Sequence, residues 1–300
     1  MEKRKIFVIG HKNPDTDSVC SAIAYAQLKN EIDTENEYIP LRAGQTNEET
    51  QYVLKQFGVN APQYVMDVKS QVKDIEIRKV DGVDRNISIK AAWKLMRDIG
   101  VVTLPITRDN KLEGLITIAD IATSYMDVHD STTLSTARTV CKNIVETLDG
   151  ALIIGDEEHV FDRGKVLVAA ANPDLMESYI RMGDIVILGN RYESQLCAIE
   201  MQAGCIVVCE GAPVSMTIKK LAVENHCTII STPHDTFTAS RLINQSVPIS
   251  FFMRTEGLIT FSTEAYTDEV RQVMAKKRHR DFPIHDEQGN YIGMISRRNL

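Results

Sequence analysis

The chain begins with an apolar run, a polar loop and the start of a helix, Ile6-Phe7-Val8-Ile9-Gly10-His11-Lys12-Asn13-Pro14-Asp15-Thr16-Asp17-Ser18. Residues 6–10 are apolar without interruption and short, which is typical of a buried strand. From Ser18 to about Ile32 the apolar residues recur with helical spacing. Either Ser18 or Asp17 is the expected N-cap of this helix, because both can accept a hydrogen bond from a free backbone N–H group.

Two further elements continue this pattern, a strand over about 37–42 and a helix over about 47–57. An alternation of strands and helices predicts the α/β class with a parallel sheet. Residues 1–64 are too few for a complete domain of this type. We therefore expect them to be part of a larger sheet, or to need a partner.

The composition of the 300 residues is that of a globular protein, with 43% hydrophobic residues and a net charge of −7. An acidic chain is not expected to bind nucleic acid over a general surface. No apolar run reaches the roughly 18 residues of a membrane helix. The start of the chain is also not typical of a secretory signal, so we expect a cytoplasmic protein without membrane contact. The six cysteines form no C-x-x-C pair and are expected to be buried thiols in a reducing compartment.

The polar loop carries His11, Asp15 and Asp17 directly after the first strand. Ligands of open α/β sheets bind at the carboxyl ends of strands. An imidazole with carboxylates suits a borderline ion such as Mn²⁺. Two carboxylates one residue apart can face two ions, and two ions can hold a phosphoryl group and activate water. The alternative is an Asx-rich turn with a helix cap, and the spacing of the three side chains favours the metal site.

An internal repeat begins after about residue 65. The first copy contains Ala92-Trp93-Lys94-Leu95-Met96, Thr103-Leu104-Pro105-Ile106 and Leu112-Glu113-Gly114-Leu115-Ile116-Thr117-Ile118-Ala119-Asp120. The second contains Val270-Arg271-Gln272-Val273-Met274, Asp281-Phe282-Pro283-Ile284 and Tyr291-Ile292-Gly293-Met294-Ile295-Ser296-Arg297-Arg298-Asn299. Each copy predicts helix, strand, turn, strand and helix. Residues 131–245 lie between the copies, alternate helical and strand patterns, and predict an inserted α/β domain.

The loop, together with the helix Val19-Cys20-Ser21-Ala22-Ile23-Ala24-Tyr25-Ala26, resembles the first motif of family II inorganic pyrophosphatases. These enzymes are the manganese-dependent members of the DHH superfamily. Other members of the superfamily cleave oligonucleotides or cyclic dinucleotides and typically carry P-D-G-D, so Thr16 favours the pyrophosphatases. The resemblance implies that His11 and Asp15 bind one metal and Asp17 the other. It also implies two Mn²⁺ or Co²⁺ ions per complete active site and a metal-activated water as the nucleophile.

The family uses further ligands, namely a bridging Asp, the Asp-His-His motif itself and another Asp, together with a C-terminal lobe that binds phosphate. This sequence contains no two adjacent histidines. We therefore expect a polypeptide truncated at its C-terminus, which lacks the remaining catalytic ligands. The reading frame beyond Leu300 is the place to look for an Asp-His-His motif.

The repeat resembles CBS motifs, which pair into a module with clefts for adenine nucleotides. A hydroxyl at Thr117 or Ser296 can donate to a phosphate, and a carboxylate at Asp120 can accept both ribose hydroxyls. Asn299 replaces this carboxylate in the second copy, which weakens the expected ribose contact there. The expected nucleotide-binding residues are Thr117, Ile118, Ala119, Asp120, Arg278, His279, Arg280, Ser296 and Asn299. The basic run 276–280 can equally be a solvated helix end that interacts with the helix dipole.

The inserted domain resembles the DRTGG domain, with Asp162-Arg163-Gly164-Lys165 as a partial match to the naming motif. The resemblance implies a partial DHH domain (1–64), a first CBS motif (65–130), a DRTGG domain (131–245) and a second CBS motif (246–300). It also implies hydrolysis of pyrophosphate, regulation by AMP, ADP, ATP or a dinucleoside polyphosphate, and a homodimer. Two alternatives stay open: a nucleotide sensor without catalysis of its own, and a DHH-type phosphodiesterase.

Overall fold

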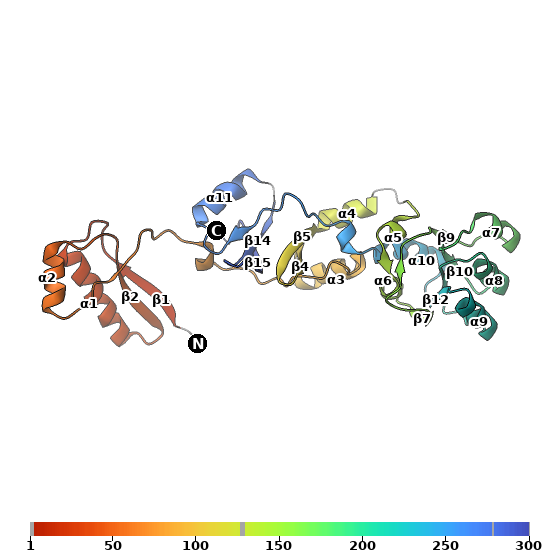
Figure 1. Ribbon diagram of the computed structural model, residues 1–300, viewed down its shortest axis with the longest axis horizontal. Helices are drawn as coiled ribbons and strands as arrows, with labels where there is room; N and C mark the ends of the chain where they lie inside the picture. The colour runs from red at the N-terminus through yellow and green to blue at the C-terminus, as the bar shows by residue number, and fades with distance from the viewer. Residues whose placement is uncertain (1–2, 127–129, 278, 300) are drawn as a thin grey trace. The chain divides into compact units, whose positions relative to one another are not determined.

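The computed structural model describes residues 3–126, 130–277 and 279–299, and the chain divides into two compact units, Met1–Gln71 and Val72–Leu300 (Figure 1). The first unit contains β1 (Arg4–Ile9), α1 (Thr16–Ile32), β2 (Asn36–Arg42), α2 (Glu48–Gln56) and β3 (Gln63–Tyr64). The strands are parallel in the order β1-β2-β3. The expected parallel sheet is therefore confirmed.

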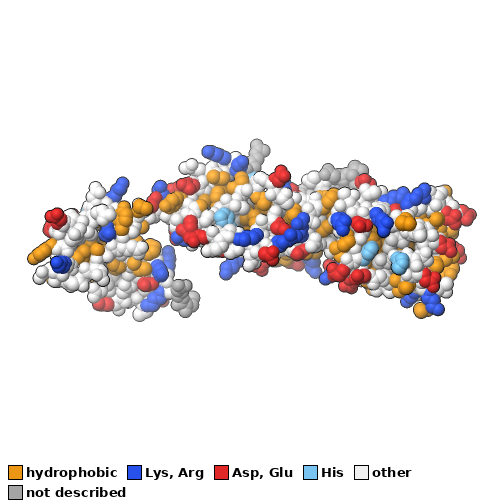
Figure 2. Space-filling model, in the orientation of Figure 1, with side chains coloured by type: hydrophobic (Ala, Val, Ile, Leu, Met, Phe, Trp, Pro, Cys, Tyr) orange, Lys and Arg blue, Asp and Glu red, His pale blue; other side chains and the backbone are white. Residues whose placement is uncertain are grey.

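Within the described residues of this unit, 3–71, helices cover one face of the sheet. Right-handed crossovers in the order β1-β2-β3 place both connecting helices on the same face. Strand β1 is apolar at successive positions, which is typical of a strand buried on both faces, yet the Phe7 side chain is 59% exposed. Apolar side chains are accordingly visible on the surface of this unit (Figure 2). The structure agrees with the expectation that this part alone is not a complete domain.

The first helix begins two residues earlier than the sequence predicted. Asp15 is the N-cap, because its carboxylate accepts a hydrogen bond from the backbone N–H of Ser18 over 2.9 Å. The expected caps, Ser18 and Asp17, are instead inside the helix. The prediction was wrong because Asn13, Asp15, Thr16, Asp17 and Ser18 are all capping types, and periodicity alone does not choose among them.

The second unit contains the two copies of the repeat. The first copy comprises α3 (Ile89–Ile99), β4 (Thr103–Arg108), β5 (Lys111–Thr117) and α4 (Ile118–Met126). The second comprises β13 (Phe261–Ser262), α11 (Thr267–Lys276), β14 (Asp281–His285) and β15 (Tyr291–Ser296). The hairpins β4-β5 and β14-β15 are antiparallel in both copies. The final helix predicted for the second copy is not formed by the described residues, since 297–299 make only a turn after β15.

The inserted domain is built on a five-stranded sheet in the order β7-β12-β11-β10-β9. Its strands are β7 (Ala151–Ile154), β9 (Val166–Val168), β10 (Ile185–Leu188), β11 (Cys205–Val208) and β12 (Thr228–Ser231). All pairs are parallel except β12 with β7. The remaining elements of the domain are α5 (Thr133–Thr136), β6 (Thr139–Val140), α6 (Cys141–Thr147), β8 (Val160–Phe161), α7 (Pro173–Tyr179), α8 (Tyr192–Glu200), α9 (Met216–Glu224) and α10 (Thr236–Leu242).

Helices cover both faces of this sheet (Figure 1). Val186 and Leu188 of β10 belong to the core beneath α7, α8 and α9. Ile185 and Ile187 point to the opposite face, whose core continues into the first copy of the repeat. Burial on both faces explains why β10 and β11 consist of uninterrupted apolar residues. No helix of the described ranges is both long enough and apolar enough to cross a bilayer.

The cysteines give a test of this packing. Five of the six are buried and Cys20 is partly exposed. Burial raises the pKa of Cys141 and Cys227 to about 12 and that of Cys209 to about 11. The thiolate is the nucleophile, so these thiols are expected to resist iodoacetamide at pH 8. Mass spectrometry should find Cys20 alkylated in the native protein and all six cysteines alkylated in denaturant. Rapid native labelling of Cys227 would contradict this core.

Candidate functional site

The loop after β1 places His11 beside Asp15. The Nε2 atom of His11 lies 3.4 Å from Oδ1 of Asp15, and both side chains are about three-fifths exposed, 59% and 61%. The hydrogen bond from the Ser18 backbone lowers the pKa of Asp15, and the neighbouring His11 lowers it further. Asp15 is therefore held as a carboxylate next to an imidazole. This donor pair suits an ion such as Mn²⁺ or Co²⁺.

Asp17 lies apart from this pair in the first turn of α1. Its Oδ1 accepts a hydrogen bond from Ser21 Oγ over 3.3 Å, and its side chain is exposed. In the part of the chain that the structure describes, no three His, Cys, Asp or Glu side chains converge on one point. The geometry thus fits a pair of ligands for one ion and a single ligand for another. It does not fit a complete metal centre within these residues.

The loop is supported by close contacts that the sequence did not predict. A Cβ atom added to Gly10 would lie 2.0 Å from Ser18 Oγ, and one added to Gly44 would lie 2.5 Å from Pro14 Cδ. The guanidinium of Arg42 donates to the carbonyl oxygen of Gly44 over 2.5 Å. The only signal in the sequence was a glycine at the end of each of the first two strands.

The start of α1 is also joined to α2. The hydroxyls of Thr16 and Thr50 lie 3.2 Å apart, and Thr50 is fully buried. Thr16 is therefore used structurally as well as being the residue that distinguishes the loop from P-D-G-D. Together with the glycine contacts, this pair fixes the loop between two helices and the strand ends.

The first copy of the repeat borders a cavity of about 360 Å³. Thr117, Ile118 and Ala119 line it, as the sequence predicted, together with His279 and Arg280 from the second copy. Asp120 does not belong to the lining. Its carboxylate accepts hydrogen bonds from Thr117 and from the guanidinium of Arg254, a residue that the sequence reasoning missed.

The second copy borders a cavity of about 440 Å³. The predicted residues that line it are His279, Arg280, Ser296 and Asn299. Arg78, Gly100, Val102, Asp281, Arg297 and Arg298 complete the lining. The structure therefore brings the predicted residues other than Asp120 and Arg278 together in two clefts that share His279 and Arg280. Arg278 lies outside the described residues.

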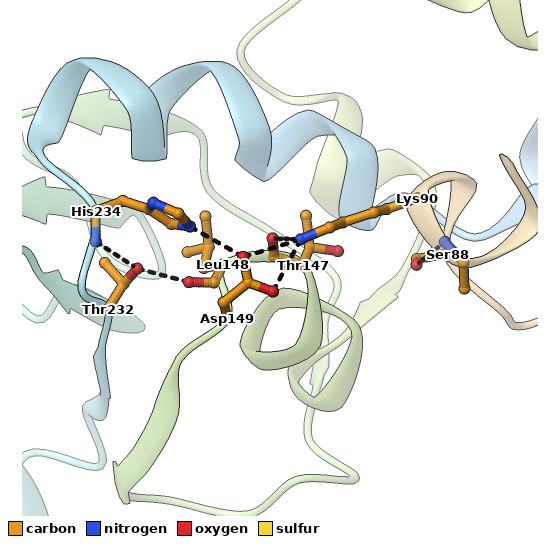
Figure 3. A network of polar contacts seen from close by, with 8 residues as sticks. Ser88, Lys90, Thr147, Leu148, Asp149, Thr232 and His234 are labelled. Atoms are coloured by element: carbon orange, nitrogen blue, oxygen red, sulfur yellow. Dashed lines mark hydrogen bonds and ion pairs between the residues drawn. The ribbon is translucent and has the colours of Figure 1, made fainter. Parts of the chain in front are cut away.

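A polar network joins the first copy of the repeat to the inserted domain (Figure 3). Lys90 of α3 donates to Asp149 over 3.0 Å and to the carbonyl oxygen of Thr147 over 2.8 Å. His234 lies 3.1 Å from the other oxygen of Asp149. Burial alone would raise the pKa of Asp149, but the hydrogen bonds from Lys90 and His234 outweigh it and lower the pKa. Buried Thr232 donates to the carbonyl oxygen of Leu148, which adds to the network.

Family models match three parts of the chain: the DHH family N-terminal domain over residues 5–154, the DRTGG domain over 143–246 and the CBS domain over 250–300. The chain is 40% identical over 99% of its length to a cobalt-dependent inorganic pyrophosphatase of Clostridium perfringens, of which it covers 54%. It is 30% identical over 99% of its length to a probable manganese-dependent inorganic pyrophosphatase of Thermotoga maritima, of which it also covers 54%. The chain thus spans about half the length of these relatives.

A solved structure resembles the second unit. It contains the CBS and DRTGG domains of the regulatory region of Clostridium perfringens pyrophosphatase, complexed with the activator diadenosine tetraphosphate. The match covers 76% of this chain and 100% of the other, with 37% sequence identity and a TM-score of 0.73.

Proposed function

The chain belongs to the DHH family, and from this premise we propose that it is the metal-binding and regulatory part of an inorganic pyrophosphatase. The observation that carries the proposal is the approach of His11 to Asp15 after β1, with Asp17 two residues on. Two relatives support the proposal: the cobalt-dependent pyrophosphatase that is 40% identical and the probable manganese-dependent pyrophosphatase that is 30% identical. In the reaction, the oxygen of water bonds to one phosphorus of pyrophosphate and the bridging P–O bond breaks, which gives two phosphates.

The loop contributes ligands and orientation to this chemistry. His11 and Asp15 would bind one Mn²⁺ or Co²⁺, and Asp17 would bind the second. Such a pair of ions lowers the pKa of water and neutralises charge on the phosphoryl oxygens. The backbone of Ser18 holds the Asp15 carboxylate, and the N-terminus of α1 adds a field that favours an anion. The three ligands supply only part of a two-metal site, so the activity is proposed for the product of the whole reading frame.

We further propose that the CBS pair binds adenine nucleotides and that they regulate hydrolysis. A relative 37% identical over the same domains binds diadenosine tetraphosphate as an activator. The two clefts are lined by hydroxyl, amide and guanidinium groups, the donors that bind phosphate. AMP, ADP, ATP and dinucleoside polyphosphates are the ligands to test. A cytoplasmic homodimer completes the proposal.

The test measures phosphate release from pyrophosphate by the protein expressed from its whole reading frame, with Mn²⁺ or Co²⁺. Hydrolysis that requires the metal and changes when AMP is added is the expected result. Metal-independent hydrolysis would contradict the proposed site.

The two alternatives have distinct outcomes. AMP binding without hydrolysis of pyrophosphate would favour a nucleotide sensor that has no catalysis of its own. The incomplete metal site and the basic second cleft support this alternative. Cleavage of short oligonucleotides instead of pyrophosphate would favour a phosphodiesterase.

A further inference from the structure

A cavity of about 310 Å³ lies where the first copy of the repeat meets the inserted domain. Its walls come from α3 and α4 of the first copy, from α5 and α10 of the inserted domain (Figure 1), and from the segment after α10. As far as the structure describes the chain, this lining shares no residue with either of the two clefts. A volume at the lower end of the range for small-molecule sites indicates a small ligand.

Two side chains of this cavity, Arg241 and Asn244, can donate hydrogen bonds to an anion. Among the described residues Arg241 forms no ion pair, and its guanidinium carbon lies 5.8 Å from the centre of the Phe237 ring. Asn244 is partly buried in the 3₁₀ helix η2 (Ile243–Ser246), and no other described residue is hydrogen-bonded to its side-chain amide. Buried amides are usually hydrogen-bonded in folded proteins. Both groups are therefore available to a ligand.

Three hydroxyl groups of the lining can act only as acceptors toward a ligand. Ser124, Thr133 and Ser240 each donate the hydroxyl hydrogen to the backbone carbonyl oxygen three residues earlier, over 2.7, 2.7 and 2.8 Å respectively. A hydroxyl has one hydrogen and two lone pairs, so each oxygen can still accept a hydrogen bond. A ligand that matches this cavity therefore carries O–H or N–H donors as well as an anionic group.

The charge of the lining decides which donors match it. Arg241 is the single charged side chain among the described residues of the lining. Burial raises the pKa of the Tyr125 phenol, and the charge of Arg241 partly offsets this rise, so the phenol is neutral at pH 7. An ammonium group on the ligand would be repelled by Arg241 without a carboxylate nearby to compensate. Hydroxyl groups are therefore the donors that fit, and Ile89 and Phe252 supply apolar surface for the carbon framework.

From these observations we propose that the cavity binds a sugar phosphate or a polyol phosphate. The guanidinium of Arg241 binds two phosphate oxygens at once, and the amide of Asn244 donates to the third. A carboxylate has only two oxygens and would leave one of these donors unused. The hydroxyl groups of the ligand donate to the oxygens of Ser124, Thr133 and Ser240.

A ligand in this cavity contacts two domains at once. Ser124 belongs to α4 of the first copy, and Arg241 belongs to α10 of the inserted domain. A ligand that binds only the folded form stabilises it, so the bound sugar phosphate is expected to raise the midpoint of thermal unfolding. The proposal does not depend on nucleotide regulation, because the two clefts contribute no described residue to this lining.

The test is isothermal titration calorimetry of the 300-residue chain with glucose 6-phosphate and with glycerol 3-phosphate. Excess AMP is present and no metal is added, so that neither the two clefts nor the metal loop is the site measured. At least one probe is expected to bind once per chain with a Kd below about 1 mM. Glucose lacks the anion and inorganic phosphate lacks the hydroxylated framework, so each is expected to bind at least about tenfold more weakly.

Three variants locate the binding. Arg241→Met removes the guanidinium and is expected to weaken binding of the probe at least about thirtyfold, because hydrogen bonds between charged groups are the strong ones. Ser240→Ala removes one acceptor and is expected to weaken binding about threefold or more. Arg97→Met, at an arginine of α3 that is 66% exposed, is the matched control and should leave binding unchanged.

Circular dichroism checks that each variant is folded, and Ser240→Ala decides the question if Arg241→Met is not. The failure of both probes to bind the wild type would overturn the proposal. Unchanged binding by folded Arg241→Met would place the bound probe elsewhere and also overturn it. Inorganic phosphate that binds as tightly as the probes would show a simple anion site and exclude the sugar phosphate. None of these results would contradict the hydrolysis of pyrophosphate or its regulation by nucleotides.

Discussion

Replacing Asp15 by alanine is expected to lower metal-dependent hydrolysis of pyrophosphate by at least about a thousandfold, equivalent to about 4 kcal/mol of activation free energy. The carboxylate lies 3.4 Å from His11 and shares its proposed ion. A bound ion supplies several kcal/mol of transition-state stabilisation, which is lost when the ion is lost or displaced. The measurement is kcat/KM with Mn²⁺ for the wild type and the variant, both expressed from the whole reading frame.

The control must separate the metal role of Asp15 from its role as N-cap of α1. Asp15→Ser removes the carboxylate and keeps a side chain that caps helices well. It is expected to be as inactive as Asp15→Ala but more stable by about 1 kcal/mol, the usual value of a cap. Asn47→Ala removes the cap of α2, where Asn47 accepts from Thr50 N over 2.7 Å, and should remain active. Near-normal hydrolysis by Asp15→Ser would show that this residue is structural.

Much of this architecture could be predicted because its determinants are local in sequence. The strand–loop–helix of residues 4–32 has an apolar run, capping residues and helical periodicity within a short span. The repeat was visible because corresponding residues recur at nearly constant spacing. Matches to the DHH, DRTGG and CBS families confirm the expected domain types, whereas the first CBS motif (65–130) and the domain bounds stay predictions.

The contacts that define the clefts could not be predicted in the same way. Arg254 and Asp120 are 134 residues apart, and nothing near Arg254 marks it as the partner of a carboxylate. The same holds for the approach of Gly44 to Pro14, which depends on how two loops lie at one sheet edge. Such pairs follow from tertiary packing and not from local pattern. Asp120 could therefore be identified from the sequence as a candidate ligand. That other side chains occupy its acceptor positions could not be predicted.

The partial DRTGG motif contains Gly164, which could be required either for binding a ligand or for the packing of the inserted domain. Its φ is +85°, and a Cβ atom there would lie 2.2 Å from the carbonyl oxygen of Gly183 and 2.6 Å from the backbone nitrogen of Asp184. These neighbours are backbone atoms and cannot rotate away. The buried carboxylate of Asp184 fixes the same turn, since it accepts from the backbone N–H groups of Lys165 and Arg181, each over 2.9 Å. The glycine is therefore required by the packing of two chain segments.

Gly164→Ala is accordingly expected to destabilise the inserted domain by about 3 kcal/mol or more, because a left-handed φ and an overpacked contact each cost on the order of 1–3 kcal/mol. Alanine substitutions at two other glycines of the same domain separate the cost of the backbone conformation from the cost of the overpacked contact. Gly211 has a φ of +60° and open space around its Cβ position, and Gly189 has open space without a positive φ. Gly211→Ala should thus show only the cost of the backbone conformation, about 1–2 kcal/mol, and Gly189→Ala almost none.

The buried thiol of Cys227 reports on this domain specifically, since it reacts with iodoacetamide only when the domain opens. When opening and closing are fast, the alkylation rate follows the equilibrium population of the open form, so a loss of about 3 kcal/mol should raise the rate by roughly a hundredfold. Alkylation of Cys227 is expected to be fastest in Gly164→Ala and slower in Gly211→Ala. In Gly189→Ala its rate should be close to that of the wild type. If Gly164→Ala labelled no faster than Gly211→Ala, the contact with Gly183 would not explain the glycine. A role for this turn in binding a ligand would then be the better account of the motif.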